Sequence, residues 1–144
     1  KAAGADHVLL HKQVDVAKEV RALTGGKGVP VILDGVGKAT WQVSLDSAAR
    51  RGLIVSYGNA SGAIDGVALG VLAAKGSLFV SRPTLFDYYV TPDERQAGID
   101  RLFEMLAKGA IVPEIGQTFA LEDVANAHRA LEAGETRGAT VLIP

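Results

Sequence analysis

The strongest constraint on the fold is an alternation of short apolar runs with helical patterns. Five runs are strand-like, and they cover residues 7–10, 29–33, 53–57, 78–81 and 140–143. The middle three lack polar/apolar alternation, which is typical of parallel strands that are buried on both faces. Helical patterns fall between them, so the order predicts βαβ units. The expected class is therefore α/β, a parallel sheet with helices on both faces.

The helical patterns carry their own boundary signals. The pattern "VDVAKEVRAL" follows Asp15 and stops at a glycine pair, and "TWQVSLDSAARRG" is expected to stay helical through its basic residues up to Gly52. A third pattern, "VALGVLAAKG", ends in the same way at Gly76. Thr91 is expected to cap a long helix that has Pro92 at its first position. The last helix begins in "LEDVANAHRALEAG".

Composition excludes several classes of protein. The chain has 144 residues, 48% of them hydrophobic, which suits one globular domain with a substantial core. Its net charge is −1 and its largest basic cluster is Arg50–Arg51, so no nucleic-acid partner is expected. No apolar run approaches the roughly 18 to 20 residues that span a bilayer, so no membrane partner is expected. The absence of cysteine excludes disulfides and thiolate sites, and it fits a cytoplasmic location.

The stretch "VILDGVGKATW" raises the question of a phosphate-binding loop. Gly35 and Gly37 are two residues apart, which fits neither the P-loop spacing nor the G-x-G-x-x-G fingerprint. Two interpretations stay open: a strand that turns into a helix, or a strand end that lines a ligand crevice, as carboxyl ends do in open α/β sheets. In either case Asp34 is expected to support the turn rather than to act as an acid or base.

Five segments together resemble a known family. They are "AGADHVLL", "LTGGKGVPVILDGVG", "WQVSLDSAARRGLIVSYGNASG", "KGSLFVSRP" and "LEDVANAHRALEAGETRGATVLIP". In order and spacing they resemble the zinc-independent quinone oxidoreductases, which are NADPH-dependent members of the medium-chain dehydrogenase/reductase superfamily related to lens zeta-crystallin. The resemblance covers essentially the whole chain.

The resemblance implies a division of the chain. Residues 1–115 would be the later part of a Rossmann NADPH-binding domain, and residues 116–144 the segment that returns to a GroES-like catalytic domain. The run at 7–10 would then be the third strand of the Rossmann sheet, and the first two strands would lie outside this chain. We expect the isolated chain to be inactive and to bind the cofactor weakly, because the first glycine-rich turn would be outside it as well.

The same resemblance implies the cofactor-binding residues. Three groups follow the three central strands, and a histidine follows the first run: Gly35, Val36 and Gly37; Tyr57, Gly58 and Asn59; Arg82, Pro83 and Thr84; and His11. His11 would lie near the adenosine 2′-phosphate region, and the others near the nicotinamide half. No catalytic residue is identified, and no metal site is expected, because the three histidines have no acidic or cysteine companions at ligand spacing.

The function that the resemblance implies is hydride transfer from NADPH to a quinone or an α,β-unsaturated carbonyl, without zinc. An enoyl reductase that acts on acyl thioesters and a non-catalytic nucleotide-binding or structural module are the alternatives. The family also implies a homodimer formed through the apolar edge strand that contains Leu78, Phe79 and Val80.

Overall fold

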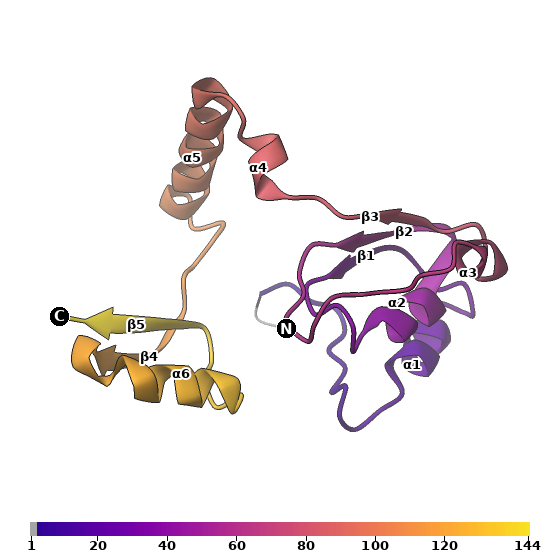
Figure 1. Ribbon diagram of the computed structural model, residues 1–144, viewed down its shortest axis with the longest axis horizontal. Coiled ribbons are helices and arrows are strands. Elements are labelled where there is room, and N and C mark those ends of the chain that lie inside the picture. Colours follow the sequence, from indigo (N-terminus) through magenta and orange to yellow (C-terminus); the bar gives the residue numbers. More distant parts are fainter. Residues whose placement is uncertain (1–2) are drawn as a thin grey trace. The chain divides into compact units, whose positions relative to one another are not determined.

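The structure is a computed structural model that describes residues 3–144, and it forms two compact units, one up to Tyr88 and one from Tyr89 (Figure 1). The first unit contains α1 (Val16–Leu23), β1 (Val29–Asp34), α2 (Trp41–Ser47), β2 (Ala48–Ser56), α3 (Gly70–Ala74), β3 (Phe79–Ser81) and α4 (Leu85–Tyr88). The second contains α5 (Pro92–Ala107), β4 (Ile115–Ala120), the 3-10 turn Leu121–Asp123, α6 (Val124–Glu132) and β5 (Ala139–Ile143).

The first unit is built around a parallel sheet in the order β1-β2-β3. Asp34 at the end of β1 pairs with Ser56 at the end of β2, and Ser81 at the end of β3 pairs with Val55. All three carboxyl ends therefore lie at one edge of the sheet. The expected α/β class and the three central strands are confirmed, with β2 longer than expected.

One face of this sheet carries the core. Ile54 of β2 packs with Leu45 and Ala48, all at most 1% exposed, and with Leu78. Helix α2 packs on β1 and β2, and α1 packs on α2 (Figure 1). The paired residues Val31, Leu53 and Phe79 point to the opposite face, where Val31 and Phe79 are 53% and 57% exposed. Among residues 3–144, the expected helical cover is thus present on one face of the sheet and not on the other.

The expected strand at residues 7–10 is wrong. This segment has no strand assignment, and among the described residues β1 pairs with β2 alone. A strand forms only where a neighbour takes up its N–H and C=O groups. The apolar character of the segment predicted a strand, but no described strand lies beside it to pair with it.

The expected helix from Trp41 to the region of Gly52 is too long. Helix α2 ends at Ser47, and Ala48 already pairs with Val29 of β1. The next pair is Val31 with Leu53, so residues 49–52 bulge out of the ladder. Arg51 in this bulge has a φ of 63°, which a helix does not allow. The basic residues that suggested a helix end lie in a bulge instead.

The second unit holds the long expected helix and an unexpected strand. Thr91 caps α5 by accepting from the Glu94 backbone N–H at 3.2 Å, and Glu94 accepts from the Thr91 N–H at 2.8 Å. The predicted cap and the first-position Pro92 are confirmed. Strand β4 was not predicted, yet it pairs in parallel with β5, the confirmed strand at the end of the chain. Residues 1–115 and 116–144 remain a predicted division into domains.

Candidate functional site

Asp34 organises the turn that follows β1. Its carboxylate accepts from the backbone N–H groups of Val36 and Gly37 at 2.9 and 3.0 Å, and from the hydroxyls of Thr40 and Ser44 at 2.8 and 2.7 Å. Burial raises the pKa of Asp34, but these four hydrogen bonds together outweigh burial, so the pKa lies below its usual range. The carboxylate is ionised and fully engaged, which confirms that Asp34 supports the turn.

The turns after β1 and β2 meet through glycines. A Cβ on Gly58 would lie 2.2 Å from the carbonyl oxygen of Gly35, and a Cβ on Gly35 would lie 2.9 Å from the ring of Tyr57. A Cβ on Gly37, whose φ is +89°, would lie 2.7 Å from the carbonyl oxygen of Gly62. Backbone therefore packs directly on backbone at this edge. The ring of Tyr57 lies against Gly35, and residue Tyr57 is 57% exposed.

Ser61 fastens the two turns together. Its backbone N–H and its hydroxyl both donate to the carbonyl oxygen of Val36, at 2.8 and 2.7 Å, and its Oγ accepts from the Ala39 N–H at 2.9 Å. The Lys38 N–H adds a bond of 3.1 Å to the Gly62 carbonyl oxygen. Sequence reasoning missed Ser61. A small hydroxyl residue next to a glycine in a loop is the signal for such a contact.

Arg82 joins the end of β3 to the end of β2. Its Nη1 donates to the backbone oxygen of Ser56 at 2.6 Å. Pro83 and Thr84 follow directly, and the Thr84 carbonyl oxygen accepts from the Asp87 N–H at the start of α4. Val36, Gly37 and Asn59 belong to the turns after β1 and β2. Nine of the ten residues expected to line a cofactor site therefore follow the ends of three adjacent strands.

His11 stands apart from that group. It lies in an exposed turn after the segment 7–10, and its side chain makes no hydrogen bond with any residue the structure describes. Residues 3–144 bring together no group of three or more His, Asp or Glu side chains that would hold a metal ion. No helix among these residues has the length and apolar character needed to cross a membrane.

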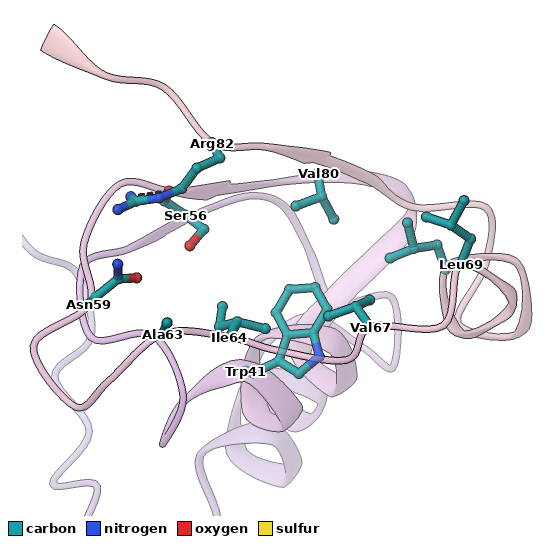
Figure 2. A pocket seen from close by; sticks show the side chains of 10 residues that line it. Trp41, Ser56, Asn59, Ala63, Ile64, Val67, Leu69, Val80 and Arg82 are labelled. Carbon is teal, nitrogen blue, oxygen red and sulfur yellow. Dashed lines mark hydrogen bonds between the residues drawn. The ribbon is translucent and has the colours of Figure 1, made fainter.

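A cavity of about 360 Å³ opens beside Arg82 and Asn59, on the helix-covered face of the sheet (Figure 2). Trp41 at the start of α2 forms one wall, and Val80 of β3 forms part of the opposite side. The segment between β2 and α3 contributes Ile64, Val67 and Leu69. The sequence did not indicate this cavity, because its lining comes from four separate segments.

Open parallel α/β sheets bind their ligands at the carboxyl edge, and dinucleotide-binding domains of dehydrogenases are one class of protein with this arrangement. The chain belongs to the zinc-binding dehydrogenase family, whose model matches residues 3–142. It is 51% identical over 141 residues to the quinone oxidoreductase of Pseudomonas aeruginosa, a match that covers 98% of this chain and 43% of that protein.

Solved structures agree with this assignment. The quinone oxidoreductase of Pseudomonas syringae is 49% identical, with a TM-score of 0.92, and the chain covers 44% of it. The Escherichia coli quinone oxidoreductase in complex with NADPH is 43% identical, with a TM-score of 0.93 and again 44% covered. Each match covers 99% of this chain. The expected relation to quinone oxidoreductases and to the medium-chain dehydrogenase/reductase superfamily is confirmed, and the chain spans less than half the length of these relatives.

Proposed function

We propose that this chain is the NADPH-binding portion of an oxidoreductase that transfers hydride from NADPH to quinones or α,β-unsaturated carbonyls without zinc. The observation that carries the proposal is the edge formed by the turns after β1, β2 and β3. The zinc-free character of the reaction rests on the resemblance of five segments to zinc-independent quinone oxidoreductases. The Escherichia coli relative complexed with NADPH supports the choice of cofactor.

The edge suits a flat polar ring and a sugar. There is no space for a side chain at Gly35 or Gly58, so these residues can contact a ligand only through backbone atoms. Val36, Gly37, Asn59, Pro83 and Thr84 would line the same edge, and His11 would serve the 2′-phosphate end. NADPH, when bound, supplies the hydride.

Two side chains would orient a bound nicotinamide. The exposed ring of Tyr57 offers a face for contact with the ribose or the nicotinamide. Arg82 donates one N–H to the backbone oxygen of Ser56, and its other N–H groups are available to a carboxamide or phosphate oxygen. These groups bind and orient the cofactor, which supplies the hydride when it is bound.

Cofactor binding is tested by titrating the 144-residue chain with NADPH and following the fluorescence of the nicotinamide. We expect weak, saturable binding that Arg82→Ala weakens roughly tenfold, since a hydrogen bond to a charged group is lost. Arg101→Ala is the matched control, because Arg101 is an exposed arginine on α5 paired with Glu104. Equal NADPH affinities of the two variants would show that Arg82 does not contact the cofactor. Absence of NADPH binding would refute the cofactor assignment for the isolated chain.

The reaction is tested in a chimera, with this chain joined to the amino-terminal part of the Pseudomonas aeruginosa relative. We expect NADPH oxidation with 1,2-naphthoquinone at a rate that a metal chelator leaves unchanged. Loss of the rate with chelator would contradict the zinc-free reaction. Faster turnover of crotonyl-CoA would favour an enoyl reductase, and NADPH binding without turnover of either substrate would favour a non-catalytic module.

We also propose a homodimer formed through the edge strand of residues 78–80. Strand β3 lies at the end of the sheet order, and Phe79 and Val80 are 57% and 41% exposed, whereas Leu78 is buried in the core. An exposed apolar edge favours pairing with a second copy. Light scattering is expected to show a dimer that Phe79→Lys converts to a monomer. A wild-type monomer at micromolar concentration would refute the interface.

A further inference from the structure

An open hollow of about 550 Å³ lies beside the start of β2, at the opposite end of that strand from the glycine turns. Three segments line it: the end of α1 with the loop that follows, the start of β2, and the end of α3. They contribute four cationic side chains, which are Arg21, Lys27, Arg50 and Lys75. Among the described residues, the lining includes no acidic and no aromatic side chain. The fold therefore gathers positive charge from positions far apart in the sequence.

Most of this charge is not neutralised within the molecule. Lys75 forms an ion pair with Asp46. The ion pairs between residues 3 and 144 include none made by Arg21, Lys27 or Arg50. Like charges held close together repel one another, and an anion placed between them relieves that repulsion.

The guanidinium of Arg21 is held in a fixed orientation. It donates from three nitrogens to backbone oxygens, at 2.9 Å to Asp46, 3.1 Å to Gly26 and 2.7 Å to Ala48. A guanidinium has five N–H donors, so two remain for a ligand. Because Arg21 is already ordered, binding through these donors loses little side-chain entropy.

Capping of the helices does not account for the cluster. Cations near the end of a helix often bind its last carbonyl groups. Here the carbonyl oxygens of residues 20–22 in α1 and 71–73 in α3 accept from backbone N–H groups of the residues that follow. Lys27 and Arg50 lie outside both helices. These two cations are therefore free of a capping role.

The bulge in β2 brings Arg50 to the hollow. Its neighbour Arg51 has a φ of 63°, a conformation that is unfavourable for residues other than glycine. The Arg51 N–H donates to the Gly76 carbonyl oxygen at 2.8 Å, and a Cβ on Gly76 would lie 3.2 Å from the Cα of Arg50. Bulges redirect side chains in this way. The strained bulge thus fixes the backbone of Arg50 against the end of α3.

We propose that the hollow lined by Arg21, Lys27, Arg50 and Lys75 binds a small anion with two linked phosphate groups, of which inorganic diphosphate is the simplest. Guanidinium groups bind phosphate oxygens in pairs, and ammonium groups add point charges. Without an aromatic side chain in the lining, a nucleobase has no ring to stack on. The site goes beyond the proposed function, because the proposed cofactor edge lies at the other end of β2, beyond Ser56.

Isothermal titration calorimetry of the 144-residue chain with sodium diphosphate tests the site, at a constant ionic strength of about 0.15 M to screen distant charges. We expect saturable binding, with weaker binding of orthophosphate and sulfate, which carry less charge and reach fewer of the cations. Saturating NADPH should leave the diphosphate affinity unchanged. ADP should bind no more tightly than diphosphate, because the lining offers nothing to its base or ribose.

Neighbouring arginines provide a matched pair of variants. Arg50→Gln should weaken diphosphate about tenfold, since a hydrogen bond between charged groups is lost, and Lys27→Gln should have a similar effect. Arg51→Gln is the control, because Arg51 is the next residue and is exposed but does not line the hollow. It should weaken diphosphate by no more than about twofold. Circular dichroism and the fluorescence of Trp41 check that each variant is folded.

No saturable binding in the folded wild-type chain would overturn the proposal. Equal weakening by Arg50→Gln and Arg51→Gln would show a diffuse positive surface instead of a site. Displacement of diphosphate by NADPH, or clearly tighter binding of ADP, would assign the anion to a nucleotide site and also overturn it. Diphosphate binding without NADPH binding would refute the proposed cofactor site alone, and NADPH binding without diphosphate binding would refute this site alone.

Discussion

Replacing Asp34 with alanine should strongly destabilise the first unit. The carboxylate accepts from four donors, and two of these bonds, from Gly37 and Ser44, are buried. Hydrogen bonds to a charged group contribute about 1.5–3 kcal/mol each, and donors left buried without a partner are unfavourable. Counting only the two buried bonds, Asp34→Ala should lower the free energy of unfolding by about 3–6 kcal/mol, a large part of the 5–15 kcal/mol typical of a domain.

Urea unfolding followed by the fluorescence of Trp41 measures this change. A loss of that size should lower the unfolding midpoint by about 2 M urea. Asp65→Ala is the matched control, because Asp65 is an exposed carboxylate in the loop between β2 and α3. If the midpoint of Asp34→Ala coincided with that of Asp65→Ala, the carboxylate would not organise the turn.

The dependence on pH gives a second check on Asp34. Its folded-state pKa is lowered, so its contribution to stability is fully present above the unfolded-state value of about 3.9. The contribution is lost as pH falls through the folded-state pKa. The difference in unfolding free energy between wild type and Asp34→Ala should therefore be constant near neutral pH and shrink below about pH 4. A difference that stays constant down to pH 2 would refute the reasoning.

Three further changes have definite expected outcomes. Gly58→Ala places a Cβ 2.2 Å from a backbone oxygen, so thermal unfolding should show a fall in Tm of more than about 10 °C. Arg21→Lys replaces a guanidinium that donates from α1 to the backbone oxygens of Asp46 and Ala48, and calorimetry should show a destabilisation of about 1–2 kcal/mol. Thr91→Ala removes the capping box of α5 and should reduce helicity in circular dichroism, with a loss of about 1 kcal/mol. An unchanged Tm in Gly58→Ala, an unchanged unfolding free energy in Arg21→Lys, or an unchanged helicity in Thr91→Ala would contradict the corresponding expectation.

The sequence predicted those elements of the fold that depend on residues close together in the chain. The apolar runs of β1 to β3 and the capping signal of Thr91 both depend on residues close together in the chain, and both were confirmed. The segment 7–10 has the same apolar character as β1, but a strand also requires a neighbour, which no local pattern reveals. Strand β4 shows the converse, because it exists through its pairing with β5 about twenty residues later.

The sequence predicted where the candidate site lies, but it did not predict the contacts that hold its turns together. Parallel strands bring their carboxyl ends to one edge, so the positions of Gly35, Tyr57 and Arg82 followed from the order of the elements. The contact of Gly58 with Gly35 and the bonds of Ser61 depend on how two turns pack. The cavity at Ser56 depends on which side chains leave space unfilled. These are properties of tertiary packing that residue types alone do not specify.

The contact between Gly35 and Gly58 has a consequence for how this edge can vary. Main-chain contacts and the Ser61 hydroxyl hold the two turns together, and at the contact itself there is no room for a side chain on Gly35 or Gly58. A neighbouring position such as Ala60, which is exposed, can change its chemistry without moving the scaffold, whereas a single added methyl group at Gly58 cannot be accommodated. A library of variants across residues 56–62 should therefore contain folded proteins of many compositions, nearly all of which retain glycine at position 58.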